Sequence, residues 1–179
     1  MEQPPPDLKD WTWTIRSRCP DCGLDVGKID IDQVADQLEA AAVEWVQILT
    51  QHPAADRRPS PLIWSPLEYG AHVRDVLGLY DARLVLMLVE DYPTFNNWDQ
   101  DEAAISADYL SLDPDQVAAE ISGYSQTLVA RIRALEDSQL DRRGARSDGA
   151  EFTVLTFLQY LLHDVVHHLW DVTGQPADV

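Results

Sequence analysis

The chain has 179 residues, of which 45% are hydrophobic and 25% charged, as in one globular domain. Thirteen basic against 31 acidic residues give a formal net charge of -18, which would repel nucleic-acid phosphates and anionic membranes. No apolar run reaches the roughly 18 to 20 residues of a membrane span. Residues 1–6 lack the basic start and apolar stretch of a secretory signal. We therefore expect a cytoplasmic protein without nucleic-acid or membrane partners.

Residues 1–30 are rich in Pro, Asp and Gly, and we expect them to form an extended arm before a helical domain at residues 31–179. Trp11, Thr12, Trp13, Thr14 and Ile15 form its one strand-like run. Exposed indoles would be a liability in a mobile tail, so we expect the two tryptophans to anchor the arm on the domain.

Both cysteines lie in the arm, in the sequence CPDCG at residues 19–23. This pattern resembles one knuckle of a zinc ribbon, in which Pro and Gly shape a turn that presents both sulfurs. Cys19 and Cys22 supply only half of a four-ligand site, which a partner chain or a histidine such as His52 would have to complete. A redox pair and inert reduced thiols are the alternatives.

The first two helices are predicted at residues 31–49 and 66–89. Asp30 or Asp32 is placed to cap the first helix, whose apolar positions follow the 3.6-residue period. Ser65, Pro66 and Glu68 form the capping-box pattern at the start of the second. The second helix is apolar on most of its circumference, so we place it centrally in a bundle.

The second half of the chain predicts two further helices, at residues 113–135 and 152–174. The preceding connection, residues 90–113, is long for a compact domain, and we expect a crossover between non-adjacent helix ends. Residues 141–149 form a polar turn region, for which a short hairpin is an alternative. These elements predict an all-α four-helix bundle with an N-terminal arm.

The last helix carries two histidines, His163 and His167, one turn apart on the same face. They lie on a stripe away from the apolar seam of this helix, so they should face a groove or cavity. Imidazoles that reach one point suit zinc, nickel, iron or copper. The alternative is a pair of ordinary polar-face residues.

A third ligand should come from another helix, and His72 on the predicted central helix is the best candidate. His52 lies in a helix-breaking region, and His168 points about 100° away from His167, so both rank lower. Three protein ligands leave positions open for water or substrate, as a catalytic site requires. Side chains that could orient the imidazoles as outer partners are Glu68, Asp75, Tyr160 and Asp171.

A rival interpretation compares residues 163–167, HDVVH, with the HExxH pattern of zinc proteases. Asp164 would take the place of the glutamate. Its side chain is one methylene shorter, which moves a general base away from a metal-bound water. This difference disfavours a protease.

Residues 64–76, WSPLEYGAHVRDV, together with the late pattern His163-x-x-x-His167-His168, resemble the DinB-like family of four-helix bundles. The resemblance extends over roughly residues 31–175. It implies an up-down-down-up bundle with a long crossover, a divalent metal held by His72, His163 and His167, and frequent dimers.

Characterised members of this family include mycothiol-dependent maleylpyruvate isomerase and bacillithiol S-transferases. The resemblance therefore implies a metal-dependent enzyme that activates a low-molecular-weight thiol or a water toward a small-molecule substrate. Zinc or nickel is the expected metal, with iron or manganese as alternatives, and mycothiol or bacillithiol the expected thiol. A non-catalytic metal-binding stress or interaction protein, with association or redox sensing through the CxxC arm, is the alternative.

Arg142, Arg143 and Arg146 form the one basic cluster of this acidic chain. They could recognise an anionic substrate or thiol cofactor at the mouth of the bundle. A solvated turn is the plainer interpretation.

Overall fold

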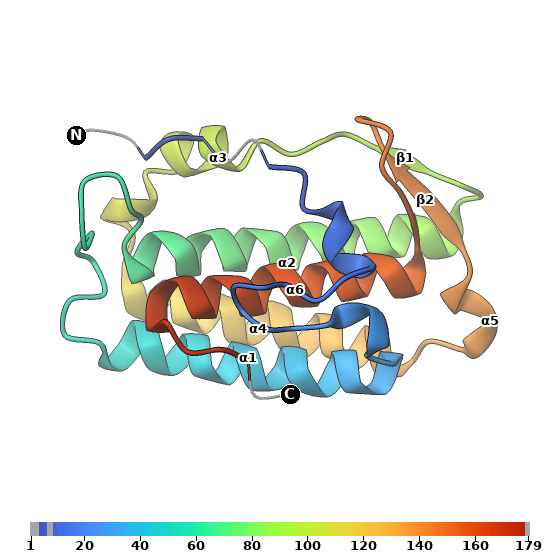
Figure 1. The fold of residues 1–179 in the computed structure, drawn as a ribbon, viewed down its shortest axis with the longest axis horizontal. Helices are drawn as coiled ribbons and strands as arrows, with labels where there is room; N and C mark the ends of the chain where they lie inside the picture. Colours follow the sequence, from blue (N-terminus) through green and yellow to red (C-terminus); the bar gives the residue numbers. More distant parts are fainter. Residues whose placement is uncertain (1–3, 7–8, 178–179) are drawn as a thin grey trace.

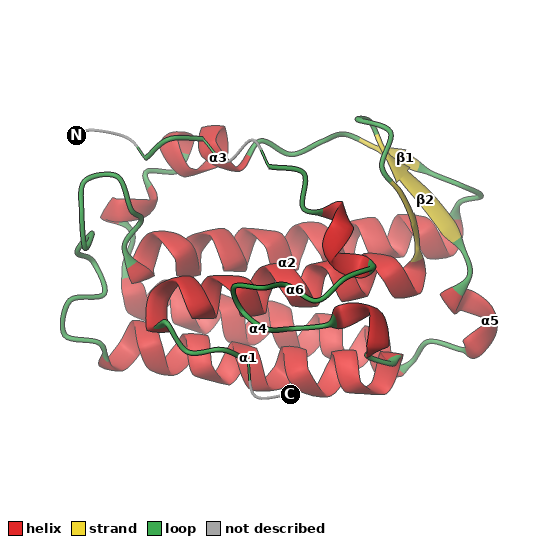
Figure 2. Ribbon diagram, in the orientation of Figure 1, coloured by secondary structure: helices red, strands yellow, loops and turns green. Residues whose placement is uncertain are grey.

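The computed structural model describes residues 4–6 and 9–177, and four long helices dominate it (Figure 1). Outside the described residues lie residues 1–3, which belong to the segment considered for a secretory signal, and residues 178–179, at the end of the predicted domain. The four helices are α1 (Ile31–Gln51), α2 (Pro66–Val89), α4 (Pro114–Arg133) and α6 (Val154–Thr173). The predicted helical bundle is therefore confirmed (Figure 2).

The helices are arranged up-down-down-up: α1 and α6 run in one direction and α2 and α4 in the other (Figure 1). Both α4 and α6 pack against α1 and α2. Because α2 and α4 are parallel, residues 90–113 must return along the whole bundle, and they include α3 (Gln100–Ser106) and the 3-10 helix η3 (Tyr109–Ser111). The predicted crossover is thus confirmed.

Local sequence signals fix the starts of three of these helices. Asp30, Ser65 and Thr153 each accept a hydrogen bond from the backbone N–H three residues later, and the side chain at that later position bonds back to the cap. Gly174 ends α6 with a φ of 67°, a conformation that costs glycine little. The helix that carries the candidate histidines is therefore defined at both ends by its own sequence.

A small sheet closes one end of the bundle. Strands β2 (Arg143–Arg146) and β3 (Glu151–Thr153) form an antiparallel hairpin, and β1 (Thr94–Phe95) from the crossover pairs in parallel with β2. A short helix, α5 (Asp137–Leu140), precedes the hairpin. The hairpin alternative for residues 141–149 is confirmed, whereas the parallel β1 pairing could not be read from local sequence.

The N-terminal arm lies along α6 and contains two 3-10 helices, η1 (Thr12–Ile15) and η2 (Val26–Lys28) (Figure 1). The expectation of a strand at residues 11–15 is wrong, because the Thr14 hydroxyl donates to the carbonyl of Trp11 and favours a tight turn. Leu24 and Val26 are buried in the same apolar core as the bundle helices. The arm is therefore packed as part of the fold.

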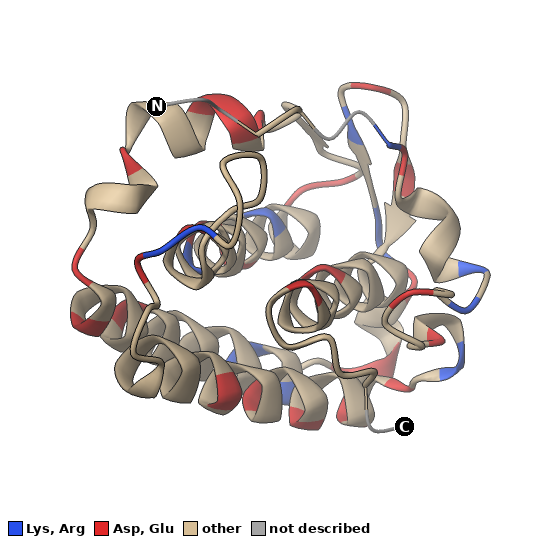
Figure 3. Ribbon diagram, turned by 60° about the vertical axis from the view of Figure 1, so that its left-hand side comes forward, with Lys and Arg blue, Asp and Glu red and all other residues tan. Residues whose placement is uncertain are grey.

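The acidic residues of α1 lie on its solvent-facing side (Figure 3). None of the helices in the described part of the chain is long and apolar enough to cross a membrane.

Candidate metal centres

Side chains that bind metals gather in two neighbouring groups, both built on α6. The first group consists of Cys19, Cys22, His163 and His167, and the second of His72, Asp164 and His168. Within each group the donor atoms lie within 4.8 Å of one another. Each group uses a pair of α6 residues four positions apart, and the second pair is offset by one residue from the first. A shift of about 100° around the helix therefore separates the two groups.

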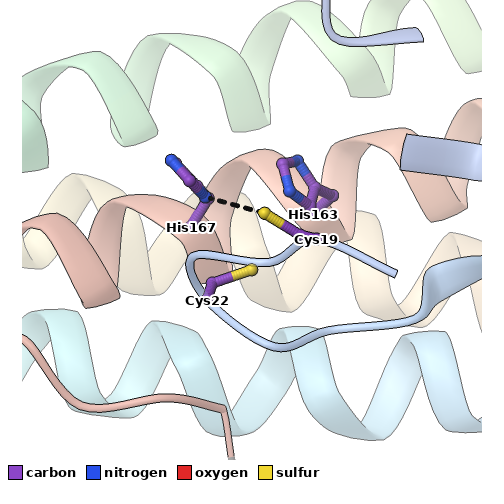
Figure 4. Close-up of side chains that lie close together, drawn as sticks. All are labelled: Cys19, Cys22, His163 and His167. Carbon is purple, nitrogen blue, oxygen red and sulfur yellow. Dashed lines mark hydrogen bonds between the residues drawn. The ribbon is translucent and has the colours of Figure 1, made fainter. Parts of the chain in front are cut away.

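The first group lies between α6 and the CxxC turn of the arm (Figure 4). The N–H of Gly23 donates to the carbonyl of Cys19 over 3.0 Å, and Gly23 has a φ of 80°, so the turn brings both sulfurs to one side. Both cysteines are completely buried and not joined in a disulfide. His163 and His167 are buried beside them, and both also line a pocket, so the expectation that this stripe faces a cavity is confirmed.

The donor atoms of the first group have few other partners. Sγ of Cys19 lies 3.6 Å from Nδ1 of His167, and Nε2 of His163 is buried without a hydrogen-bond partner among the described residues. Burial lowers the pKa of His163 to about 4, with a further contribution from neighbouring His167. Burial also raises the pKa of the Cys22 thiol to about 12. Burial therefore favours the neutral forms of His163 and Cys22.

The second group centres on Asp164, which lies between two histidines. Oδ1 of Asp164 is 3.1 Å from Nε2 of His168 and 3.6 Å from Nε2 of His72. On the far side of its ring, Nδ1 of His168 is 2.8 Å from Oδ2 of Asp171. Burial opposes a charge on His168, but these two carboxylates outweigh it and raise its pKa to about 9. Burial likewise opposes the Asp164 anion, but its contacts with His168 and His72 hold its pKa well below the usual range.

His72 packs against two indole rings. It is 1% exposed, and its ring centroid lies 5.5 Å from that of Trp98 and 5.8 Å from that of Trp64. Neither of its ring nitrogens has a hydrogen-bond partner among the described residues. Such an orphaned imidazole is costly in a protein interior and is typical of a residue whose partner is a ligand.

A pocket of about 310 Å³ opens above both groups. Its walls are apolar and aromatic and include Trp11, Leu62, Ile63, Trp64 and Tyr69. Its polar side includes His163, Asp164, His167, His168 and Asp171. Apolar walls with a few convergent polar groups are typical of a small-molecule site.

The three histidines predicted as one ligand set are divided between the two groups. His72 is grouped with Asp164 and His168, while His163 and His167 are grouped with the cysteines. The set of His72, His163 and His167 therefore stays a prediction, and the geometry favours the other division. His168 does point away from His167, as expected, but this direction leads it toward His72 and Asp164.

The other histidine and the predicted outer partners have different roles. His52 is exposed and accepts a hydrogen bond from the N–H of Ala54, outside both groups. Asp75 binds the Tyr109 hydroxyl and Arg74. Glu68 pairs with Arg58 and caps α2. Tyr160 lines the pocket, and Asp171 contacts His168, so these two of the four lie at the site.

The three arginines of the predicted basic cluster also separate. Arg142 donates to the carbonyls of Met87 and Glu90 and so fastens the hairpin region to the end of α2. Arg143 makes an exposed ion pair with Glu151. Arg146 pairs with Asp148 and lines a second hollow beside the pocket, which Tyr160 also lines. Only Arg146 of the three is placed to meet a ligand.

Neither of the two groups was predicted as a set from the sequence, although each had a signal. Asp164 and His168 have the same spacing of four as His163 and His167, so two ligand pairs lie on adjacent stripes of one helix. A C-x2-C pair and an H-x3-H pair together make a complete Cys2His2 set of zinc ligands. The long separation between the two pairs concealed that match.

Both donor sets fit a divalent metal. The first offers two thiols and two imidazoles, one with an orphaned buried nitrogen, which is a usual set for zinc. The second offers two imidazoles and one carboxylate, and neither nitrogen of its His72 makes a hydrogen bond among the described residues, although Nε2 lies 3.6 Å from Asp164. Two histidines and one carboxylate are a usual set for catalytic zinc or non-haem iron.

Comparison with known proteins identifies the family. Residues 31–172 match the model of the DinB superfamily, and the chain therefore belongs to that superfamily. A solved structure of YfiT from Bacillus subtilis, described as a probable metal-dependent hydrolase with an unusual four-helix bundle topology, is similar in fold. The TM-score is 0.72 at 21% sequence identity, over 80% of this chain and 84% of YfiT. No curated protein matches the sequence.

Proposed function

We propose that this member of the DinB superfamily is a metal-dependent enzyme in which His72, Asp164 and His168 hold a divalent metal beside the pocket. The main support for this proposal is the buried His72 ring, because neither of its nitrogens has a hydrogen-bond partner among the described residues. Three protein ligands leave coordination positions open, and Asp164 and His168 both line the pocket. A divalent metal held there would lower the pKa of a thiol or water and so supply a nucleophile at neutral pH.

The surrounding residues support this use of the three ligands. Asp171 bonds to Nδ1 of His168 and thereby directs Nε2 toward Asp164, the usual arrangement of a metal-binding histidine with an outer carboxylate. Trp64 and Trp98 both pack against His72 and restrict its ring. The ligands are therefore held in place by contacts that do not involve the metal.

The pocket supports a small substrate with an apolar part. Trp64, Tyr69 and Ile63 offer apolar surface that excludes water from the polar side. Tyr160 and Arg146 lie together at the adjoining hollow and are placed to meet an anionic group, such as a carboxylate of a thiol cofactor. This combination favours a low-molecular-weight thiol as cosubstrate in an S-transfer or isomerisation reaction. If water is activated in place of a thiol, the reaction would be a hydrolysis, and YfiT is described as a probable hydrolase.

The test is an activity screen coupled to metal analysis. Purified protein would be loaded with zinc, nickel, iron or manganese and assayed with mycothiol, bacillithiol, glutathione and coenzyme A against an electrophile, and with ester and amide substrates. We expect metal-dependent turnover that falls in His168→Ala by at least the roughly 10–100-fold that loss of an outer partner costs. Arg143→Ala, at an exposed ion pair, is the matched control and should keep the activity. Equal turnover by wild type and His168→Ala would exclude the proposal.

A second candidate is a non-catalytic metal-binding protein, and one observation favours it. The first group offers four protein ligands, so a metal that all four hold in tetrahedral geometry would have no position open to substrate. In that case the screen would show no metal-dependent turnover although the protein binds metal. Burial raises the pKa of Cys22 to about 12, which disfavours Cys22 as the reactive thiolate of a redox pair. The dimer expected from the family resemblance stays a prediction.

A further inference from the structure

The CxxC turn of the arm and the first histidine pair of α6 make a complete set of four metal ligands. We propose that Cys19, Cys22, His163 and His167 bind one zinc ion in a closed tetrahedral centre, which fastens the N-terminal arm to α6. This centre is separate from the site proposed above, because the two use no residue in common. Its role is structural.

The distances bring the four donors close to the geometry of zinc. With Zn–S bonds of about 2.3 Å and Zn–N bonds of about 2.0 Å, tetrahedral donors are separated by about 3.3 to 3.8 Å. Sγ of Cys19 and Nδ1 of His167 already lie 3.6 Å apart, and all donors lie within 4.8 Å of one another. The largest donor separation therefore exceeds the tetrahedral range by no more than about 1 Å, which small side-chain adjustments can remove.

Backbone hydrogen bonds hold the turn that carries the two sulfurs in one conformation. Gly23 takes a positive φ of 80°, and its N–H donates to Cys19, while the N–H of Cys19 donates to the carbonyl of Leu24 over 2.8 Å. The C-terminal segment adds a hydrogen bond from the N–H of Ala177 to the carbonyl of Cys22. The backbone around both cysteines is thus fixed by hydrogen bonds, and the two sulfurs point toward the α6 histidines (Figure 4).

The charge balance suits a buried centre. Zinc binding displaces one proton from each thiol to solvent, and Zn²⁺ with two thiolates and two neutral imidazoles has no net charge. The orphaned Nε2 of His163 would also gain a partner. A disulfide between Cys19 and Cys22 would instead leave this nitrogen unsatisfied, and it would require an oxidant.

His163 and His167 line the pocket, but the four protein ligands of the centre would fill all tetrahedral positions of a zinc ion. Trp11 lies over both histidines, with ring centroids 5.6 Å from His163 and 4.7 Å from His167. Both sulfurs are fully buried. Four protein ligands under such a cover are typical of structural zinc, whereas catalytic zinc keeps one position open.

Cobalt substitution gives a direct test, because a thiolate ligand produces a charge-transfer band and tetrahedral geometry produces intense d–d bands. The full chain would be loaded with Co²⁺ as wild type, as the double variant Cys19→Ser, Cys22→Ser, and as the double variant His72→Ala, His168→Ala. We expect the thiolate band in wild type and in the histidine variant. The cysteine variant should lack this band and should bind about one metal ion fewer per chain.

Two results would overturn the zinc centre. One is a wild-type protein that shows no thiolate band with cobalt, and the other is a purified protein whose mass reveals a Cys19–Cys22 disulfide without bound zinc.

If the cysteine variant fails to fold, zinc release from wild type on titration with an organomercurial decides the question. The expected result is one zinc released per two thiols modified, and release of none contradicts the proposal. The cobalt spectrum requires no turnover, so failure here is distinct from failure of the proposed enzyme activity.

Discussion

Sγ of Cys19 lies 3.6 Å from Nδ1 of His167, although 148 positions of the chain separate the two residues. This contact brings the arm and the last helix together and places the pocket wall that includes Trp11 over α6. Its consequence is that α6 serves two sites at once. One stripe of the helix faces the arm, and the neighbouring stripe faces α2.

Replacing Asp171 by Asn should weaken metal binding at the second group without removing a ligand. The carboxylate of Asp171 accepts from Nδ1 of His168 and fixes that ring. We expect the metal affinity of this group to fall about 10–100-fold, as is usual for an outer carboxylate partner. Competition titration with a chromophoric chelator measures it. Asp141→Asn, on the exposed turn before the hairpin, is the control, and equal affinities in the two variants would refute the role of Asp171.

Glu68→Gln should destabilise the protein by about 3 kcal/mol at neutral pH, because it removes the carboxylate that pairs with the partly buried guanidinium of Arg58. Burial opposes the Glu68 anion, but hydrogen bonds from Arg58 and Ser65 outweigh it and lower its pKa below the usual 4.5. The ion pair therefore stabilises the fold above about pH 4.5, and this contribution is lost as the pH falls through the lowered pKa.

Urea unfolding of wild type and Glu68→Gln as a function of pH checks this prediction. The difference in free energy of unfolding should be largest near neutrality and shrink in acid. Glu39→Gln is the control, because its ion pair with Arg133 is exposed and should contribute little. A difference that does not change with pH would show that the Glu68 charge is not responsible.

Chelation of zinc should loosen the arm before it affects the bundle. At free zinc about 100 times the dissociation constant, binding stabilises the folded chain by about 2.7 kcal/mol, and chelation removes this contribution. Hydrogen exchange should therefore accelerate in residues 12–29, while the core of α4 stays protected. The variant Cys19→Ser, Cys22→Ser should show the fast exchange with and without chelator. Slow exchange of the arm in the chelated wild type would contradict the expected effect.

Trp64→Ala should remove one wall of the pocket. The indole of Trp64 packs against Tyr69 and His72 and lines the cavity. We expect the dissociation constant of an aromatic fluorescent probe to rise about tenfold, since one aromatic contact contributes about 1.4 kcal/mol. Tyr124→Ala, at an exposed residue of α4, should leave probe binding unchanged. Equal effects of both substitutions would show that the probe binds elsewhere.

Much of the helical framework could be predicted because its causes are local. The capping box of Ser65 and Glu68, the stop at Gly174 and the 3.6-residue apolar periods act within one or two turns, and the structure has helices where these signals place them. The strand expected at Trp11 was wrong for a related reason. The Thr14 hydroxyl bonds to the backbone of Trp11, and this short-range competition outweighs the β-propensity of the segment.

The sequence by itself determined which residue types could bind a metal and which of them share a helical face: the cysteine pair, His163 with His167, and Asp164 with His168. Only the tertiary structure decided which pairs meet. His72 reaches Asp164 and His168 because of how α2 packs on α6, and Cys19 reaches His167 because the arm crosses α6 at that level. Such contacts depend on the packing of distant segments, and the spacing of residues within one segment carries no information about it.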